Sequence, residues 1–184
     1  MLAIKVTIDP RSFKEAAHIL RAVPRAVPRV FRRAISRTVD MAATDLKRRV
    51  GAQITVKKSE IAKGIRKTKS TYFGSIGAKE FRPGLLAFPG TKQTKHGVRY
   101  RLSRTAGRKM IEHGFIATMQ SGHRGVFARG RETRLPIGEK RGPSIWKVIT
   151  DTPGLLRACT DAAGARLGKL INDQIGVEFR RWSR

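Results

Sequence analysis

Arginine and lysine side chains dominate two neighbouring stretches of the chain. The first, AVPRAVPRVFRRAISR, covers residues 22–37, and the second, TVKKSEIAKGIRKTKS, covers residues 55–70. Guanidinium and ammonium groups bind phosphate and carboxylate oxygens, so these clusters predict a surface that faces either DNA or acidic protein, and the sequence leaves both partners open. The residues that we expect on this surface are Arg25, Arg29, Arg32, Arg33, Arg37, Lys57, Lys58, Lys63, Arg66 and Lys67.

The pattern of histidines and cysteines does not support metal or disulfide chemistry. The four histidines lack the His-Glu-x-x-His spacing that places two imidazoles on one face of a helix. The single cysteine, Cys159, excludes a disulfide within the chain and a multi-cysteine zinc site. We therefore expect no metal ion and no cofactor. The histidines are His18, His96, His113 and His123.

Two pairs of residues resemble parts of a catalytic site, and neither pattern is complete. Ser121 lies close to His123 in MQSGHRG, but no Gly-x-Ser-x-Gly motif surrounds it and no neighbouring acid orients the imidazole. Glu112 and His113 are adjacent, so they point to opposite sides of a strand or about 100° apart on a helix. The glycines of GEKRGPS (138–144) lack the Gly-Lys-Ser/Thr ending of a phosphate-binding loop. We expect that the protein is not an enzyme.

Charge is the strongest signal in the composition. Of 184 residues, 40 are Lys or Arg and 13 are Asp or Glu, which gives a formal net charge of +27. Self-repulsion on this scale destabilises an isolated compact chain, so we expect the natural surroundings to supply negative charge. The hydrophobic content of 40% is enough to build a core in a single domain over residues 1–184.

The sequence also bears on the cellular compartment. The amino-terminal MLAIKVTIDP is too short and too alternating for a signal peptide. No apolar run reaches the 18 residues or so that a membrane-spanning helix needs. We expect a protein made in a reducing cytoplasm, without membrane contact.

The first half of the chain predicts a strand and two helices. AIKVTI (3–8) alternates apolar and polar residues, as a half-buried strand does. Asp9 and Pro10 suit the start of a short helix that ends near residue 21. From Pro28, apolar residues at helical spacing predict a helix of about 22 residues that ends at Gly51. Ser59 is expected to cap a short basic helix (60–67), and a strand is expected from about residue 71 to 79.

The second half predicts antiparallel strands followed by a long helix. The Gly/Pro-rich residues 81–108 predict a mobile loop or a hairpin insertion with a strand at GVRYRLS. Short apolar pieces separated by turn signals predict adjacent strands at 114–119, 124–129 and 134–137. A helix of about 30 residues, capped by Thr150, Asp151 or Thr152, is expected to bury a stripe from Leu156 to Trp182. This order predicts an α+β fold, an antiparallel sheet with long helices packed on one face.

Residues 114–148 contain SGHRGVF, then RLPI, then GPSI, in that order. Together with the long Arg/Ala-rich helix, the lysine-rich ITVKKSEIAKGIRK and the closing helix, these motifs resemble the minor tail protein Z family of bacteriophages and prophages. The resemblance implies a structural virion protein of a long-tailed phage. It also implies a ring at the head-proximal end of the tail, sixfold to match the tail, that is needed for tail completion, head–tail joining and DNA positioning. The implied neighbours are tail-terminator and head-closure proteins and the genome DNA.

The RLPI motif has two interpretations. Pro136 removes a hydrogen-bond donor from a strand, so the strand is expected at a sheet edge, where another subunit can add. The predicted subunit interface is Arg134, Leu135, Pro136 and Ile137. Alternatively, Leu135 and Ile137 simply close the core. For the whole chain, the competing hypothesis is a free basic nucleic-acid-binding protein.

Overall fold

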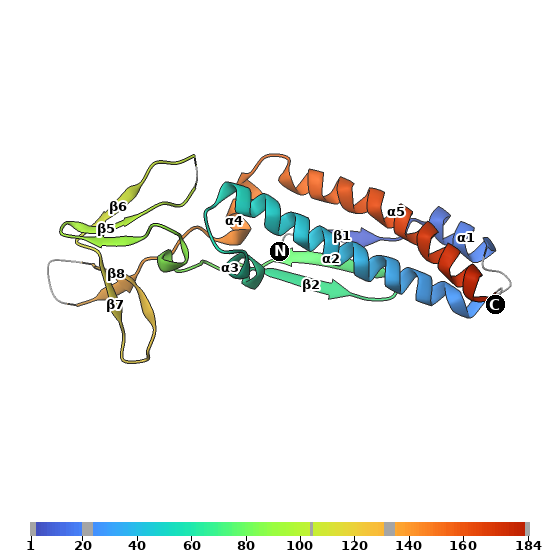
Figure 1. Ribbon diagram of the computed structural model, residues 1–184, viewed down its shortest axis with the longest axis horizontal. Helices are drawn as coiled ribbons and strands as arrows, with labels where there is room; N and C mark the ends of the chain where they lie inside the picture. The colour runs from blue at the N-terminus through green and yellow to red at the C-terminus, as the bar shows by residue number, and fades with distance from the viewer. Residues whose placement is uncertain (1–2, 20–23, 104, 131–134, 183–184) are drawn as a thin grey trace. The chain divides into compact units, whose positions relative to one another are not determined.

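The chain has an α+β fold, described by a computed structural model that places residues 3–19, 24–103, 105–130 and 135–182 (Figure 1). This confirms the predicted fold class, although the strands form three small antiparallel sheets where one was expected. The chain divides into two compact units. The helical unit comprises Met1–Leu46, Ile65–Ala78 and Thr152–Arg184, and the strand-rich unit comprises Lys47–Gly64 and Lys79–Asp151. A single domain over residues 1–184 stays a prediction.

The helical unit packs long helices against one face of a three-stranded antiparallel sheet with the order β1-β3-β2 (Figure 1). Its elements are β1 (Ala3–Thr7), α1 (Pro10–Ile19), the 3-10 turn η1 (Pro24–Ala26), α2 (Val27–Gln53) as far as Leu46, β2 (Ile65–Lys69), β3 (Phe73–Ala78) and α5 (Leu155–Trp182). The predicted first strand, the helix start at Pro10 and the strand near residues 71–79 are confirmed.

The register of this sheet explains why only one face is covered. Ile4 of β1 lies opposite Ile76 of β3, and Val6 lies opposite Gly74, so the buried side chains share one face. A Cβ atom added to Gly74 would lie 2.5 Å from a methyl carbon of Val39, which shows how closely α2 approaches β3. The glycine is therefore required by helix–sheet packing.

Two lysines of the edge strand β2 connect the sheet to α2. Lys67 and Lys69 lie opposite Ile76 and Gly74, and so belong to the covered face. Their Nζ atoms donate hydrogen bonds to Asp40 of α2, at 2.8 Å to Oδ1 and 2.6 Å to Oδ2. These hydrogen bonds, first from Lys67 and then from Lys69, hold the pKa of Asp40 below its ordinary value.

Helix α2 confirms the predicted apolar stripe and is longer than expected. The stripe residues are all buried: Phe31, Ala34, Ile35, Thr38, Ala42, Leu46 and Val50. The predicted end at Gly51 is wrong, because the helix continues to Gln53. The amide of Ile54 donates to the carbonyl of Val50 at 3.0 Å, and the buried Ile54 side chain is only 5% exposed. Burial of this isoleucine outweighs the tendency of the glycine to end the helix.

The basic stretch after α2 divides into a short helix and a strand. Helix α3 covers Lys58–Lys63, and its N-cap is Lys57, so the predicted cap at Ser59 is wrong. Residues 65–69 leave the helix because they pair with β3 as strand β2. The sequence IRKTK carries no apolar alternation, and a strand held by pairing with a neighbour leaves no local signal.

The carboxyl-terminal segment contains two helices where one was expected. Helix α4 covers Ile145–Asp151, and α5 begins at Leu155, just after Gly154 with its φ of +70°. The cap predicted at residues 150–152 is wrong, because Thr150 and Asp151 belong to α4 and the first hydrogen bond of α5 runs from the amide of Ala158 to the carbonyl of Gly154, at 2.9 Å. The predicted stripe is buried at Cys159, Ala163, Leu167, Ile171 and Ile175, whereas Trp182 is exposed. Within the described ranges, no helix combines the length and apolar character needed to cross a membrane.

The strand-rich unit contains two small antiparallel sheets, with the orders β4-β5-β6 and β7-β8-β9. Its strands are β4 (Lys92–Thr94), β5 (Gly97–Tyr100), β6 (Lys109–Glu112), β7 (Phe115–Thr118), β8 (Arg124–Arg129) and β9 (Ile137–Glu139), and a 3-10 turn, η2, covers Leu85–Ala87. The strands predicted at GVRYRLS, 114–119 and 124–129 are confirmed. Among the described residues of RLPI, only Ile137 is in a strand, and this strand, β9, lies at a sheet edge, as predicted.

The GPSI motif joins the core of the strand-rich unit through its glycine. A Cβ atom added to Gly142 would lie 2.5 Å from the Phe88 ring, and the Gly142 amide donates to the carbonyl of Pro83 at 2.8 Å. The amide of Ile145 donates to the carbonyl of Phe81 at 3.0 Å. Ile145 is buried, whereas Trp146 is 38% exposed, because adjacent helical residues point in different directions. Residues 81–88 are therefore built into the packing around this motif.

We expect Gly74→Ala to lower the free energy of unfolding by about 1–3 kcal/mol, because its methyl group would overlap side chains of α2. Gly168→Ala in α5 is the matched control. Nothing lies within 4 Å of its added Cβ atom, and Ala in place of Gly within a helix should stabilise by about 0.5–1 kcal/mol. Urea denaturation measures both. A Gly74→Ala variant as stable as the wild type would contradict the close packing of α2 on β3.

Asp40→Asn tests the link between α2 and β2 through its pH dependence. Because the pKa of Asp40 is lowered in the folded chain, its stabilising contribution is complete above the unfolded pKa and is lost as the pH falls through the folded pKa. We expect the variant to melt at a lower temperature than the wild type near neutral pH, and the two to converge in strong acid. Melting curves between about pH 7 and pH 2 measure this. A difference that does not change with pH would contradict the assignment.

Candidate anion-binding groove

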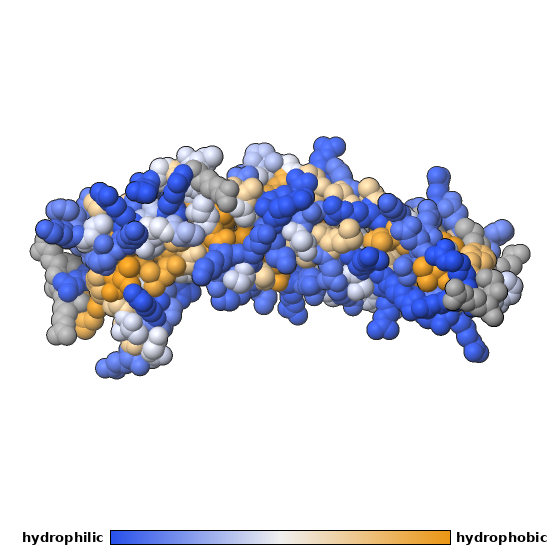
Figure 2. All heavy atoms as spheres, in the orientation of Figure 1, coloured by the Kyte–Doolittle hydropathy of each residue, from blue (hydrophilic) through white to orange (hydrophobic). Residues whose placement is uncertain are grey.

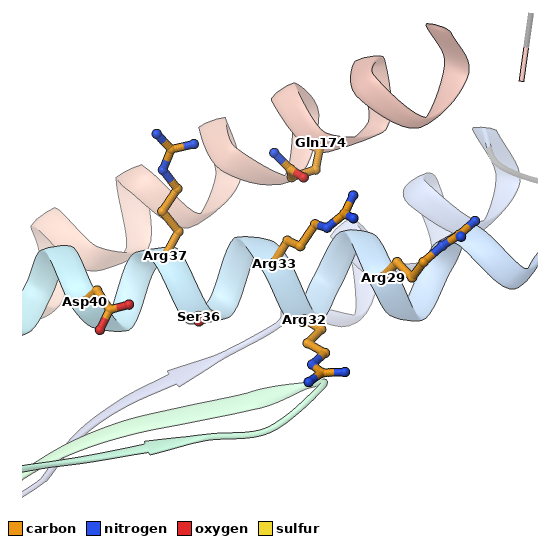
Figure 3. Close-up of a pocket in the computed structure, with 7 residues that line it drawn as sticks. All are labelled: Arg29, Arg32, Arg33, Ser36, Arg37, Asp40 and Gln174. Carbon is orange, nitrogen blue, oxygen red and sulfur yellow. The ribbon is translucent and has the colours of Figure 1, made fainter. Parts of the chain in front are cut away.

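An arginine-rich groove of about 640 Å³ runs along α2 of the helical unit and is bordered on one side by Gln174 of α5 (Figure 3). We call it the arginine groove, and its lining residues are Arg29, Arg32, Arg33, Ser36, Arg37, Asp40 and Gln174. Arg33, Arg37 and Gln174 lie where the two helices face each other, whereas Arg32 points away from α5 (Figure 3). Hydrophilic side chains gather over the amino-terminal half of α2 on the face visible in Figure 2.

Two ion pairs hold α2 and α5 antiparallel along this groove. Arg33 of α2 pairs with Glu178 of α5, and Asp45 of α2 pairs with Arg166 of α5. The two pairs are equally far apart on both helices, because Arg33 to Asp45 in α2 and Arg166 to Glu178 in α5 span the same number of residues. This separation corresponds to about 18 Å of helix. The same register places Gln174 across from Arg37.

Glu178 is the charged group that the helices bury most completely at this end. Its side chain is only 4% exposed and lies on the buried stripe of α5. Arg33 Nη1 donates to Oε1 at 2.8 Å, Arg181 Nη1 donates to the same oxygen at 3.3 Å, and Arg29 Nη2 lies 3.4 Å from Oε2. A buried carboxylate is costly without partners, so Glu178 fixes where these guanidinium groups lie.

The groove keeps a large excess of positive charge in spite of these pairs. Arg32 and Arg37 make no ion pair with any residue in the described part of the chain. Asp40 is already bound by two lysines of β2. The lining residues and their ion-pair partners therefore include seven cationic side chains and two carboxylates, an excess of five positive charges. The cations are Arg29, Arg32, Arg33, Arg37, Lys67, Lys69 and Arg181, and the carboxylates are Asp40 and Glu178. Such a surface attracts anions, and its guanidinium, hydroxyl and amide groups can donate hydrogen bonds to anionic oxygens.

The structure brings together only part of the predicted cationic surface. Arg29, Arg32, Arg33 and Arg37 line the groove, and Lys67 reaches it through Asp40. Arg66 lies on the opposite face of the sheet from Lys67, since neighbouring residues of a strand alternate. Arg25 is exposed in η1. Lys57, Lys58 and Lys63 belong to the strand-rich unit, where Lys63 pairs with Glu60 at 2.5 Å.

The predicted subunit interface lies at the edge of the β7-β8-β9 sheet. Arg134 falls outside the described residues, and Leu135 and Pro136 immediately precede β9. Leu135 is 68% exposed, so it does not close the core of the chain. Ile137 is half-buried.

The SGHRGVF motif forms the β7–β8 hairpin. Its turn is closed by the amide of Gly122, which donates to the carbonyl of Met119 at 2.9 Å, with Gly122 at a φ of +78°. Ser121 makes no hydrogen bond to His123 within the described residues, which favours a turn over a nucleophile. No group of three or more His, Cys, Asp or Glu side chains in the described ranges could hold a metal ion.

Sequence reasoning missed the acid beside this histidine. Glu139 of β9 lies 3.0 Å from His123 Nε2 and 2.6 Å from Arg141 Nη2. Burial raises the pKa of Glu139, but the hydrogen bonds from His123 and Arg141 outweigh it, so the pKa lies below its ordinary value. Pairing of β8 with β9 brings Glu139 to this place, and it ties the hairpin to the edge strand.

Sequence reasoning also missed Glu178 and Gln174. Glu178 carried a usable signal, because it follows Ile171 and Ile175 at helical spacing and is a charged residue on an otherwise apolar stripe. Gln174 carried no signal of its own, because its place in the groove depends on the register of α5 against α2.

Comparison with known proteins supports the resemblance seen in the motifs. The family model for prophage minor tail protein Z (GPZ) matches residues 12–182, which includes both the arginine groove and the SGHRGVF hairpin. Comparison with curated proteins and with solved structures found no match. A match over nearly the whole length shows the family. The chain therefore belongs to the prophage minor tail protein Z family and is a structural protein of a phage tail.

Proposed function

We propose that this tail protein forms a sixfold ring at the head-proximal end of the tail of a long-tailed phage or prophage. There it completes the tail, helps to join it to the head and positions the genome DNA. It is a virion component assembled in the host cytoplasm, in contact with tail-terminator and head-closure proteins.

The observation that carries this proposal is a charge excess that one chain cannot neutralise. The sequence has 40 cationic residues and 13 acidic ones. Several of those acids, including Asp40, Asp45, Glu139 and Glu178, are already paired within the chain. Packing several such subunits side by side brings like charges together, so the assembly must be stabilised by DNA or by acidic neighbours. A ring around DNA meets that requirement.

In this proposal, the edge strand β9 makes the contact between subunits. An edge presents unpaired backbone donors and acceptors, and the exposed Leu135 beside it offers an apolar side chain. Backbone hydrogen bonds and apolar contacts between subunits can offset the repulsion between their positive charges, whereas two guanidinium surfaces repel each other.

Leu135→Asp tests the proposed contact. Because Leu135 is 68% exposed, we expect the variant to keep the melting temperature of the wild type but to lose the ring. Met110→Asp is the matched control, an exposed apolar residue on β6 of the same unit. Mass photometry and negative-stain microscopy measure the assembly. Rings that survive Leu135→Asp would place the interface elsewhere.

Deletion of the gene tests the role in the virion. We expect particles made without the protein to be defective in infection, with DNA that is not retained at the head–tail junction, and plasmid-supplied protein to restore them. Density for a ring at this junction in cryo-electron micrographs is the direct readout. Fully infectious tails without the protein, together with monomers that bind nucleic acid, would instead favour the free nucleic-acid-binding protein.

A further inference from the structure

We propose that the arginine groove is a preorganised binding site for the phosphodiester backbone of DNA, and that the buried Glu178 is its positioning residue. In this view Arg29, Arg33, Arg37 and Gln174 contact phosphate oxygens, while Glu178 holds two of these arginines in place from below. The inference rests on the proposed function for the identity of the natural ligand, genome DNA, and deepens it by naming the residues that bind the DNA backbone.

The spacing of the arginines suits a polymer of negative charges. Arg29, Arg33 and Arg37 recur every fourth residue along one side of α2, a row of about 12 Å. One strand of duplex DNA carries a phosphate about every 3.4 Å along its axis, so the row corresponds to about three or four phosphates. Ser36 and Gln174 add hydrogen-bond donors beside the row.

The composition of the groove favours nucleic acid over an acidic protein. None of the seven lining side chains described is apolar. Protein–protein interfaces have an apolar, well-packed centre surrounded by a polar rim. Interfaces with DNA are more polar and much more positively charged. A groove whose lining residues offer guanidinium, hydroxyl and amide groups matches the second description.

Glu178 prepares the site by limiting the freedom of the arginines. A guanidinium carries about five N–H donors, and Glu178 accepts one of them from Arg33, which leaves the others for a ligand. A flexible surface arginine loses rotamer freedom when it binds, whereas an arginine already fixed by a buried carboxylate loses less. Glu178 is therefore expected to strengthen DNA binding although it carries the same sign of charge as DNA.

That expectation distinguishes a site with positioned arginines from a general attraction of DNA to the positive charge of the chain. If only total charge matters, removing any carboxylate should tighten binding to DNA. If Glu178 positions the groove, Glu178→Gln should weaken binding even though the chain becomes more positive. Asp161→Asn makes the same change of charge on α5, about 25 Å of helix away, at a side chain that is 72% exposed.

A second pair of variants tests the groove without touching the buried carboxylate. Arg37→Gln removes an arginine that lines the groove. Arg157→Gln removes an arginine from α5 whose side chain is 89% exposed. The two changes reduce the charge equally, so total charge predicts equal effects.

The experiment measures binding of the full-length variants to a fluorescent DNA duplex of about 20 base pairs by anisotropy over a salt series. Circular dichroism confirms that each variant is folded at the assay temperature. We expect Arg37→Gln to weaken binding about tenfold and to lower the slope of log affinity against log salt by about one, and Arg157→Gln to do neither. We expect Glu178→Gln to bind more weakly than Asp161→Asn.

Three results would overturn the proposal. The first is that Arg37→Gln and Arg157→Gln weaken DNA binding equally. This comparison tests the groove even if Glu178→Gln does not fold. The second is a folded Glu178→Gln variant that binds DNA as tightly as Asp161→Asn. The third is tighter, Arg37-dependent binding of polyglutamate than of DNA at equal ligand charge, which would assign the groove to an acidic protein. Each leaves ring formation untouched, because assembly is measured separately.

Discussion

The buried carboxylate of Glu178 determines how the cationic end of the helical unit is built. With its side chain only 4% exposed, it needs partners, and it takes Arg29 and Arg33 from α2 and Arg181 from its own helix. An unpaired buried charge costs several kcal/mol, so the helices must meet in a register that brings these arginines to it. Together with the Asp45–Arg166 pair, this requirement sets the antiparallel alignment of α2 and α5.

In a chain with few acidic and many cationic residues, the positions of the acids decide which cations are paired within the fold. Asp40, Asp45 and Glu178 sit between secondary-structure elements and hold them together, so their charges are satisfied inside the unit. Their use as internal ties leaves Arg32 and Arg37 as charge with no acidic partner among the described residues. The fold thus separates cations that hold the structure from cations that remain for a partner, and the arginine groove contains both kinds.

Features set by local periodicity could be predicted from the sequence, and features set by pairing between distant segments could not. The stripe from Phe31 to Val50 is buried as expected because helical spacing is written into the residues themselves. Strand β2 was missed because IRKTK becomes a strand only beside β3. The arginines were identified by type, but their partner Glu178 lies 145 residues from Arg33 along the chain. The cationic residues were predicted as one surface, and the fold assigns Lys57, Lys58 and Lys63 to the strand-rich unit.

Two of the motifs that carry the family resemblance, SGHRGVF and GPSI, belong to a different unit from the residues that line the groove. In the strand-rich unit, SGHRGVF makes a tight hairpin and Gly142 of GPSI provides the space that Phe88 fills, so both motifs are explained by packing and backbone geometry. The groove depends instead on charge, register and one buried carboxylate in the helical unit. Motifs of the first kind reveal which fold a chain adopts. Binding of a polyanion must be argued from the charged residues of the groove. There a glutamate of the same charge as the ligand can still improve the site, because it fixes the arginines that contact the ligand.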